Sequence, residues 1–253
     1  MRVRLFPYNR GSRSARMLAE QTGWLRLRTD GTSRFRPRDG DTVVNWGSSR
    51  CPDYPCRVLN PRQSIINAAD KLTSFRLLKE AGVAIPDFWE SYENAPRDTK
   101  LVGRSTLTGH SGDGISIGRK GDEVLVSDAP LYTRYIPKEH EYRVHVVGDR
   151  AIFTQRKARR LEHTDPNWEV RNLANGFVFV AAECNEATER QAVAAVQALS
   201  LDFGAVDIIF PRREPLQPLV LEVNTACGLE ERTAQKYAEA LDNYINPVLE
   251  LAA

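Results

Sequence analysis

Cysteine, methionine and long apolar runs are all scarce in this chain of 253 residues, which has four cysteines and two methionines. The cysteines Cys51, Cys56, Cys184 and Cys227 are too few and too scattered for a disulfide framework, which excludes a small disulfide-rich secreted scaffold. No apolar run reaches the length of a signal peptide or of a membrane span. We therefore expect a cytoplasmic protein with no membrane partner.

The cysteines and histidines also lack the spacing of a zinc site. Cys51 and Cys56 form a pair in the stretch CPDYPC, but no second Cys or His pair stands at matching spacing. None of the four histidines belongs to a ligand motif. We interpret the pair as two reduced thiols in a proline-rich turn rather than as half of a zinc site.

Lysine is absent from residues 1–62, where arginine takes its place. This segment has thirteen arginines and five acidic residues, a net charge of about +8, whereas the whole chain carries +2. Such a lobe either binds an anionic partner or presents a solvated arginine-rich surface. No nucleic-acid-binding motif accompanies the arginines, and aromatic residues do not interleave with them regularly, so a nucleic-acid partner is not expected. Arg13, Arg16 and Arg50 are our candidates for holding an acidic substrate.

The pattern of apolar and turn residues predicts strands and helices in mixed order. Residues 2–8 and 41–49 are typical strands on either side of a helix over 14–23, a βαβ-like arrangement. Residues 64–86 contain the periodicity of one helix, which Gly82 ends and Pro86 keeps from resuming. Further elements are expected as two or three short strands in 99–127, strands in 130–136, 203–210 and 218–224, a hairpin in 141–157, and helices in 185–202 and 231–252. The fold class is therefore α/β or α+β.

Two polar side chains stand at the end of an apolar strand in the stretch LVLEVN. Glu222 and Asn224 are two positions apart, so they point to the same face of the strand. The preceding strand carries Asp207, and the two strands are expected to run antiparallel through a short turn. Three hard oxygen ligands without His or Cys suit Mg²⁺ or Mn²⁺. The alternative is a set of structural carboxylates bonded to nearby arginine, although burying such groups without a cation is costly.

A glycine-rich loop, GRSTLTGHSGDGI, forms a second polar cluster. Backbone N–H groups around Gly109, Ser111, Gly112 and Gly114 can close over phosphate oxygens. Arg104 lies on the strand that leads into the loop and adds a positive charge. The loop is neither a Walker loop nor a dinucleotide fingerprint, because it lacks Gly-Lys-Ser/Thr and no helix follows it. Taken alone, it also fits an ordinary hairpin connection.

Six short motifs follow one another in a specific order along residues 60–230. They are DKLTSFRLLKEAGVAIPDF, LVGRSTLTGHSGDGI, LYTRYI, EYRVHVVGD, FGAVDIIF and LVLEVNTACGL. Each motif is weak alone, but their order resembles the ATP-grasp superfamily. The likeness is to its carboxylate-amine ligase branch, in particular to ribosomal-protein glutamate ligases and to ligases of amino acids and peptides.

The resemblance implies a role for each matching position. Lys71 and Arg104 match the two basic positions that hold nucleotide phosphates and the adenine edge, with arginine at 104 where lysine is usual. Thr133, Arg134 and Tyr135 match the hinge segment, whose backbone groups read the adenine edge. The glycine-rich loop matches a lid over the phosphates.

Four further positions are implied to lie near the reacting phosphate. Glu141 matches the acidic position near the ribose or the metal, and Arg143 matches the arginine that steadies the transferred phosphoryl group. Arg171 and Asn172 match the basic and amide pair near the γ-phosphate. Cys227 follows the metal strand, but this chemistry needs no thiol, so we interpret it as a packing residue.

The implied fold is an ATP-grasp fold with a small N-terminal α/β lobe and a nucleotide clamped between two α+β subdomains. We expect an arginine-rich lobe at 1–62, a central subdomain with the glycine-rich lid at 63–135, and a C-terminal subdomain with the metal site at 136–253. The implied cofactors are ATP and Mg²⁺ or Mn²⁺.

The implied activity is that of an ATP-dependent ligase. Such an enzyme activates a carboxylate as an acyl phosphate, joins it to an amine, and releases ADP and phosphate. The partners would be ATP, a carboxylate substrate and an amine substrate. An acidic peptide or protein tail is one candidate for the carboxylate, and a homo-oligomer stays open.

Two other functions are compatible with the same fold. A kinase that phosphorylates an anionic small molecule suits the arginine-rich lobe. A nucleotide-binding interaction module without turnover is the other, but the candidate metal ligands, Arg143 and Arg171 are all present, which argues against it. The stretches EVRNLANG and EVNTACGL resemble the ligases more than the kinases.

Overall fold

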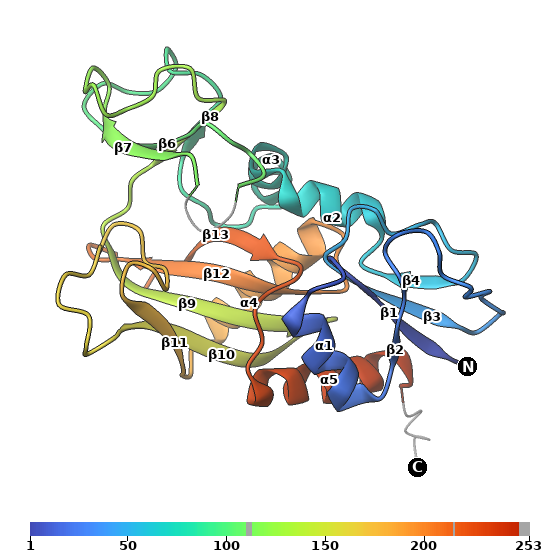
Figure 1. The fold of residues 1–253 in the computed structure, drawn as a ribbon. Coiled ribbons are helices and arrows are strands. Elements are labelled where there is room, and N and C mark those ends of the chain that lie inside the picture. The colour runs from blue at the N-terminus through green and yellow to red at the C-terminus, as the bar shows by residue number, and fades with distance from the viewer. Residues whose placement is uncertain (110–112, 215, 248–253) are drawn as a thin grey trace.

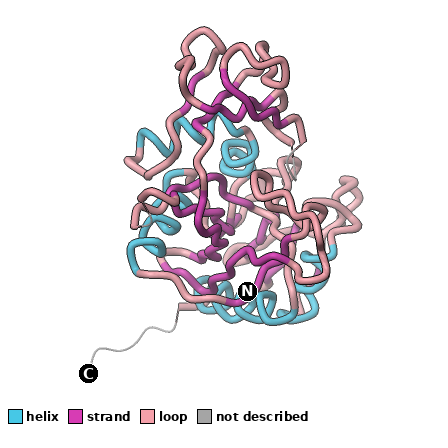
Figure 2. Tube along the Cα trace, turned by 90° about the vertical axis from the view of Figure 1, so that its left-hand side faces the viewer, coloured by secondary structure: helices cyan, strands magenta, loops and turns pink. Residues whose placement is uncertain are grey.

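Three sheets and five helices make up the part of the chain that the computed structural model describes, residues 1–109, 113–214 and 216–247. The helices are α1 (Arg13–Thr22), α2 (Arg62–Ala69), α3 (Lys71–Glu80), α4 (Glu186–Ala198) and α5 (Glu231–Ile245). Figure 2 shows a small group of strands at one end of the molecule and the other strands at the opposite side of a helical layer. The expected mixture of helices and strands is confirmed.

The N-terminal sheet is parallel and has the strand order β2-β1-β3-β4. Its strands are β1 (Val3–Pro7), β2 (Leu25–Arg26), β3 (Thr42–Trp46) and β4 (Arg57–Leu59). Every residue of β3 is buried, as its β-branched sequence predicts. Between β1 and β2, the hydroxyl of Ser12 accepts a hydrogen bond from Ala15 N and starts α1, and Gly23 ends the helix in the left-handed conformation.

The large sheet is antiparallel and has the order β11-β10-β9-β12-β13. Its strands are β9 (Lys138–Val147), β10 (Arg150–Arg159), β11 (Phe177–Ala181), β12 (Phe203–Pro211) and β13 (Leu219–Asn224). Alternation along the strands separates two faces: Val144 and Val206 pack in the cluster that includes α4. Phe203 packs at one end of the opposite face, whereas Arg143 and Asp207 lie farther along that face. One buried face therefore supports the fold while the other also carries polar groups.

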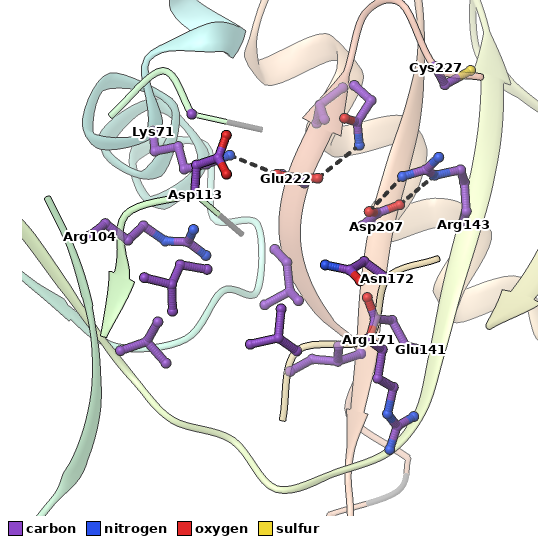
Figure 3. A pocket seen from close by; sticks show the side chains of 18 of the residues that line it. Lys71, Arg104, Asp113, Glu141, Arg143, Arg171, Asn172, Asp207, Glu222 and Cys227 are labelled. Atoms are coloured by element: carbon purple, nitrogen blue, oxygen red, sulfur yellow. Dashed lines mark hydrogen bonds and ion pairs between the residues drawn. The ribbon is translucent and has the colours of Figure 1, made fainter. Parts of the chain in front are cut away.

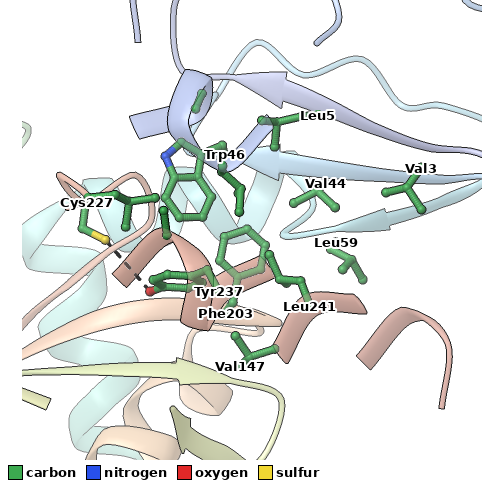
Figure 4. Packing of buried hydrophobic residues seen from close by; sticks show 14 of the residues in the cluster. Val3, Leu5, Val44, Trp46, Leu59, Val147, Phe203, Cys227, Tyr237 and Leu241 are labelled. Carbon is green, nitrogen blue, oxygen red and sulfur yellow. Dashed lines mark hydrogen bonds between the residues drawn. The ribbon is translucent and has the colours of Figure 1, made fainter. Parts of the chain in front are cut away.

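A shared apolar core joins the N-terminal sheet to the large sheet (Figure 4). Trp46 of β3 stacks on Phe203 of β12 with ring centroids 5.4 Å apart. Tyr237 of α5 meets the edge of Trp46 at 5.2 Å. Because all three rings are almost fully buried, the N-terminal lobe is anchored to the large sheet by apolar burial.

The small sheet is antiparallel and has the order β5-β8-β6-β7. Its strands are β5 (Phe88–Trp89), β6 (Lys100–Arg104), β7 (Ile115–Arg119) and β8 (Leu131–Arg134). It has its own apolar cluster, which includes Leu101 and Tyr132. The loop after β6 contacts α3, because Lys71 N donates to Leu107 O at 3.0 Å. Each of the three sheets falls within one of the expected segments 1–62, 63–135 and 136–253, whose division into domains stays a prediction.

Some elements differ from the sequence-based expectation. The single helix expected from residue 64 to Gly82 is wrong in its continuity, because it is broken at Asp70, whose carboxylate accepts from Thr73 N at 2.7 Å and caps α3. Its end is as expected, since α3 ends at Glu80 and Gly82 follows with a φ of 73°. The expected helix over 231–252 is found as α5, with residues 248–253 outside the described part. Strand β11 was not expected, because its sequence FVFVA has no alternation. No helix in the described part of the chain is long and apolar enough to cross a membrane.

Asn60 connects the N-terminal lobe to β12, which gives a stability prediction. Its amide donates to Phe203 O at 2.9 Å and accepts from Asp202 N at 2.7 Å and from Phe203 N at 3.2 Å. It is fully buried with φ of 54°, a conformation that asparagine tolerates better than alanine. We expect Asn60→Ala to lower the free energy of unfolding by about 2 to 4 kcal/mol in urea denaturation.

The matched control is Asn60→Gly, which loses the same side-chain hydrogen bonds but adopts a positive φ without strain. It should destabilise less than Asn60→Ala, and the difference between the two variants measures the backbone strain. An Asn60→Ala variant within about 0.5 kcal/mol of wild type would show that this connection contributes little.

Candidate active site

A cleft of about 540 Å³ lies between the small sheet and the polar part of the large sheet. Tyr8 and Gly47, which follow β1 and β3, also line it, so the carboxyl ends of parallel strands open toward the cleft. Its volume is in the range of small-molecule sites. Most of the predicted site residues line this cleft: Lys71, Arg104, Gly109, Thr133, Arg134, Tyr135, Glu141, Arg143, Arg171, Asn172, Asp207, Glu222 and Asn224.

The register of β12 and β13 brings the three candidate metal ligands together. Asp207 lies directly opposite Glu222, and Asn224 lies two residues farther along β13. Directly opposite residues of antiparallel strands, and residues two apart on one strand, share a face. The cleft-lining side chains of all three therefore lie at one site, which Figure 3 shows from close by.

Each carboxylate of this set is paired with a cation. Lys71 Nζ lies 2.7 Å from Glu222 Oε2, and Asn224 Nδ2 donates to Glu222 Oε1 at 3.1 Å. Arg143 donates from Nε to Asp207 Oδ1 at 2.7 Å and from Nη2 to Oδ2 at 2.8 Å, a bidentate pair. Burial alone would raise the pKa of Glu222, but Lys71 reverses this and holds it well below its usual range. Glu222 is therefore a carboxylate that can bind a cation.

The donor set fits a hard divalent cation. Carboxylate and amide oxygens are the ligands that Mg²⁺ and Mn²⁺ prefer. Within residues 1–109, 113–214 and 216–247, no group of three His, Cys, Asp or Glu side chains is gathered as a metal site. The candidate set is thus two acids and one amide, a sparse set of the kind that magnesium shares with nucleotide phosphates.

Two lysines at this site were missed in the sequence. Glu141 is 3% exposed and lies between Lys157 Nζ at 2.5 Å and Lys138 Nζ at 2.8 Å. Burial would raise the pKa of Glu141, but the two ammonium groups lower it overall. Lys157 also lies 4.0 Å from Asp207 Oδ2. In the sequence, Lys157 stands in the basic run RKARR, and nothing there distinguishes it from its neighbours.

Two arginines bring positive charge into the cleft without an acidic partner among the described residues. The Nε atoms of Arg104 and Arg171 are buried and have no hydrogen-bond partner there. Arg171 donates to Lys138 O at 3.0 Å, and burial lowers the pKa of both guanidinium groups. A buried cation with unused donors is costly unless an anion binds it. The cleft is therefore suited to an anionic ligand.

The hinge segment has fewer free backbone groups than the resemblance implies. Arg134 N donates to Asp87 O and Tyr135 N donates to Lys100 O, both at 2.8 Å. The guanidinium of Arg134 pairs with the Asp87 carboxylate at 2.8 Å. The next residue, Ile136, lines the cleft, and its N–H group has no hydrogen-bond partner in the described chain.

The glycine-rich loop is only partly covered by the structure. Ser111 and Gly112 lie outside the described residues. Gly109 lines the cleft, whereas Gly114 does not. The carbonyl of Gly114 accepts from Ser105 N at 2.9 Å, and its φ of 68° marks a turn that glycine favours.

A buried polar network lies next to the site on β9. His145 is fully buried, with Nε2 3.0 Å from Gln155 Oε1 and Nδ1 3.2 Å from the hydroxyl of Tyr237. Cys227 Sγ lies 3.8 Å from the same Nδ1. Burial raises the pKa of the Cys227 thiol to about 11, so the thiol stays protonated near neutral pH. This agrees with a packing role for Cys227.

Known proteins with similar sequences are ligases, although no family model matches the chain. A probable alpha-L-glutamate ligase of Stenotrophomonas maltophilia strain K279a is 28% identical over 224 residues, which cover 79% of this chain and 73% of the relative. A probable alpha-L-glutamate ligase of Haemophilus influenzae is 27% identical over 214 residues, which cover 77% and 68%.

Solved structures share the architecture. The ATP-grasp ligase PsnB, complexed with its minimal precursor, has a TM-score of 0.70 at 14% identity and covers 95% of this chain and 98% of its own. D-alanine–D-alanine ligase from Bacillus anthracis has a TM-score of 0.63 at 15% identity, with 96% and 95% covered. The protein has the ATP-grasp fold. With its sequence relatives, this confirms the predicted likeness to the carboxylate-amine ligases of that superfamily and supports ATP-dependent amide-bond formation.

The buried His145 predicts how stability depends on pH. Burial lowers the pKa of His145 from 6.5 to about 4, so the unfolded chain takes up this proton at higher pH than the folded protein. The contribution of His145 is complete above pH 6.5 and is lost as the pH falls toward 4. We expect this loss to be on the order of 3 kcal/mol, measured by urea unfolding across the interval.

The test variant is His145→Gln, which keeps a donor and an acceptor but does not titrate. It should show a smaller decrease of stability over this pH interval than wild type. Replacement of the partly exposed His163 by glutamine is the control and should leave the decrease unchanged. Equal pH profiles for wild type and His145→Gln would contradict the prediction.

Proposed function

We propose that the protein is an ATP-dependent ligase that activates a carboxylate as an acyl phosphate and joins it to an amine, with the cleft as its active site. One observation carries the assignment to this cleft. Two carboxylates and an amide lie on one face of β12 and β13, and the buried guanidinium groups of Arg104 and Arg171 lie in the same cleft with unused donors. An ion-paired acidic face beside unsatisfied cations suits a metal-bound polyphosphate.

The cations of the cleft would bind and orient the phosphates. Lys71 and Arg104, on the side of α3 and β6, would hold the non-transferred phosphates. Arg143 and Arg171 would lie on the opposite side and neutralise the charge on the transferred group. Phosphoryl transfer depends on positioning and charge stabilisation, so fixed guanidinium groups are effective.

Asp207, Glu222 and Asn224 would hold Mg²⁺ or Mn²⁺. When bound, the ion would neutralise negative charge on the phosphates and orient them. The chain's own part is to hold the two acids in place through their ion pairs with Lys71 and Arg143.

The nucleobase would lie against the apolar part of the cleft. Val102, Ile117 and Ile136 line it from the small sheet, and Ile209 and Leu221 line it from the large sheet. The unused N–H group of Ile136 would donate to the base, since those of Arg134 and Tyr135 are engaged. Apolar walls with a few placed polar groups are typical of such sites.

The reaction has two chemical steps. A carboxylate oxygen attacks the γ-phosphorus, the bond to ADP breaks, and an acyl phosphate forms. The amine nitrogen then attacks the acyl carbon, phosphate leaves, and the nitrogen loses a proton. Water would hydrolyse the acyl phosphate, which is why the glycine-rich loop is proposed to close over the cleft.

The substrates follow from charge and from the relatives. The similar proteins are described as glutamate ligases, and PsnB is complexed with a precursor peptide, so peptides and acidic amino acids are our proposed substrates. A cytoplasmic location belongs to this proposal, and a homo-oligomer stays open. A kinase would form ADP and a phosphorylated acceptor without releasing phosphate. A non-catalytic module would bind the nucleotide and form no product.

ATP turnover with mixtures of acids and amines, in the presence of Mg²⁺, tests the proposal. We expect ADP and phosphate in equal amounts, dependent on both an acid and an amine. Glu222→Gln should lower kcat about 100-fold or more, because glutamine keeps the shape of the side chain but not its charge.

The matched control is Glu90→Gln, which removes a carboxylate that pairs with Arg76 at the protein surface. This variant should retain the activity of wild type. ADP formation without phosphate release, dependent on one acceptor, would identify a kinase. Nucleotide binding without turnover in any mixture would identify a binding module.

A further inference from the structure

A second hollow lies in the N-terminal lobe, away from the active-site cleft. It has a volume of about 480 Å³, and its lining contains six arginines and no acidic residue, all of them described. The arginines are Arg2, Arg4, Arg26, Arg34, Arg36 and Arg38. The sequence showed the excess of arginine in this lobe, but not that these six gather around one hollow.

Most of this charge is not neutralised within the protein. Arg2 pairs with Asp41 at 2.6 Å, and Arg2 holds the pKa of that carboxyl well below its usual range. No other hollow-lining arginine forms an ion pair with a described acid. Arg34, Arg36 and Arg38 are exposed on the loop between β2 and β3. Arg26 is exposed as well, and Arg4 is partly exposed. Four positive charges therefore face solvent together, an arrangement that attracts a chain with several negative charges.

The hollow also borders an open strand edge. β2 is the edge strand of the N-terminal sheet, and both of its residues, Leu25 and Arg26, line the hollow and are exposed. An edge strand has backbone N–H and C=O groups available to an extended peptide. Backbone groups and guanidinium groups at the same place fit a peptide whose side chains are carboxylates.

The one aromatic side chain of the hollow is not free to stack on a base. The guanidinium carbon of Arg2 lies 5.3 Å from the centroid of Phe35, and that of Arg4 lies 5.7 Å from it. The edge of Tyr54 contacts the same ring. Single-stranded nucleic acids are bound through aromatic stacking as well as charge. The hollow therefore favours a peptide over a nucleic acid.

We infer that this hollow is a docking site for an acidic segment of a peptide that the active-site cleft modifies. The choice of a peptide that is also a substrate rests on the proposed function. β1 connects the two places, because Arg2 and Arg4 lie at its start and Tyr8, at the cleft, follows its end (Figure 1). Arg2 and Tyr8 are six residues apart along extended chain, which corresponds to roughly 20 Å. In a peptide that occupies both places, the acidic segment must therefore lie several residues away from the group that reacts.

Binding of a fluorescein-labelled oligoglutamate of about ten residues, measured by fluorescence anisotropy, tests the site. The test variant replaces Arg34, Arg36 and Arg38 with alanine. Their side chains are exposed, and Arg2 and Arg4 keep their contacts, so the thermal unfolding midpoint should not change. We expect wild type to bind the probe, salt to weaken binding, and the variant to raise Kd about ten-fold or more.

The matched control replaces Arg13, Arg16 and Arg50 with alanine. The sequence analysis named these exposed arginines as candidates for holding an acidic substrate, but they line neither the hollow nor the cleft, so the present proposal places the acidic segment at the hollow-lining arginines instead. The loss of charge is the same, so Kd should change less than about two-fold. Equal weakening by both triple variants would show an effect of net charge alone and would overturn the site.

Three further outcomes would overturn the proposal. They are no binding of oligoglutamate to wild type, equal binding of oligoglutamine, and equal or tighter binding of an oligothymidylate of the same length. The titration uses neither ATP nor turnover. A negative result therefore leaves the ligase proposal standing, and a failure of the ligase assay leaves the result of this titration standing.

Discussion

The pairing of Glu222 with Lys71 and of Asp207 with Arg143 is the constraint on which the site depends. Glu222 is held by Lys71 from the helix after Asp70, and Asp207 is held by Arg143 from the neighbouring strand. Charged side chains that are largely removed from water are tolerated only when they are paired or bind a ligand. The two ion pairs connect α3, β9, β12 and β13 around one face, and Lys71 holds the pKa of Glu222 well below its usual range. Arg104 and Arg171, which have no such partner among the described residues, add the charge that an anionic ligand would satisfy.

The N-terminal lobe depends on the same large sheet. Trp46, Phe203 and Tyr237 form one core with it, and Asn60 adds hydrogen bonds at the end of β4. This attachment directs the carboxyl ends of β1 and β3 toward the cleft, while the arginine-rich hollow lies at the other end of β1. One end of the lobe thus borders the proposed active-site cleft, and the other end presents the arginine-rich hollow to solvent.

Local sequence patterns predicted much of the fold and of the site because both depend on short-range spacing. The separation of Glu222 from Asn224 determines their common face, and Gly148 marks the turn between β9 and β10. The break at Asp70 was missed because an N-cap in mid-helix resembles a surface residue. Lys157 and the arginine hollow were missed because they depend on strand order and on loop packing. Neither property is encoded in the spacing along one segment.

Calorimetric titration with ADP, with and without Mg²⁺, tests the central claim that the paired acids and the cations of this cleft form a magnesium-nucleotide site. The account predicts that ADP binds and that its affinity increases when Mg²⁺ is present, since Asp207, Glu222 and Asn224 would share the ion with the phosphates. An ADP affinity that is the same with and without Mg²⁺, or no ADP binding at all, would contradict it.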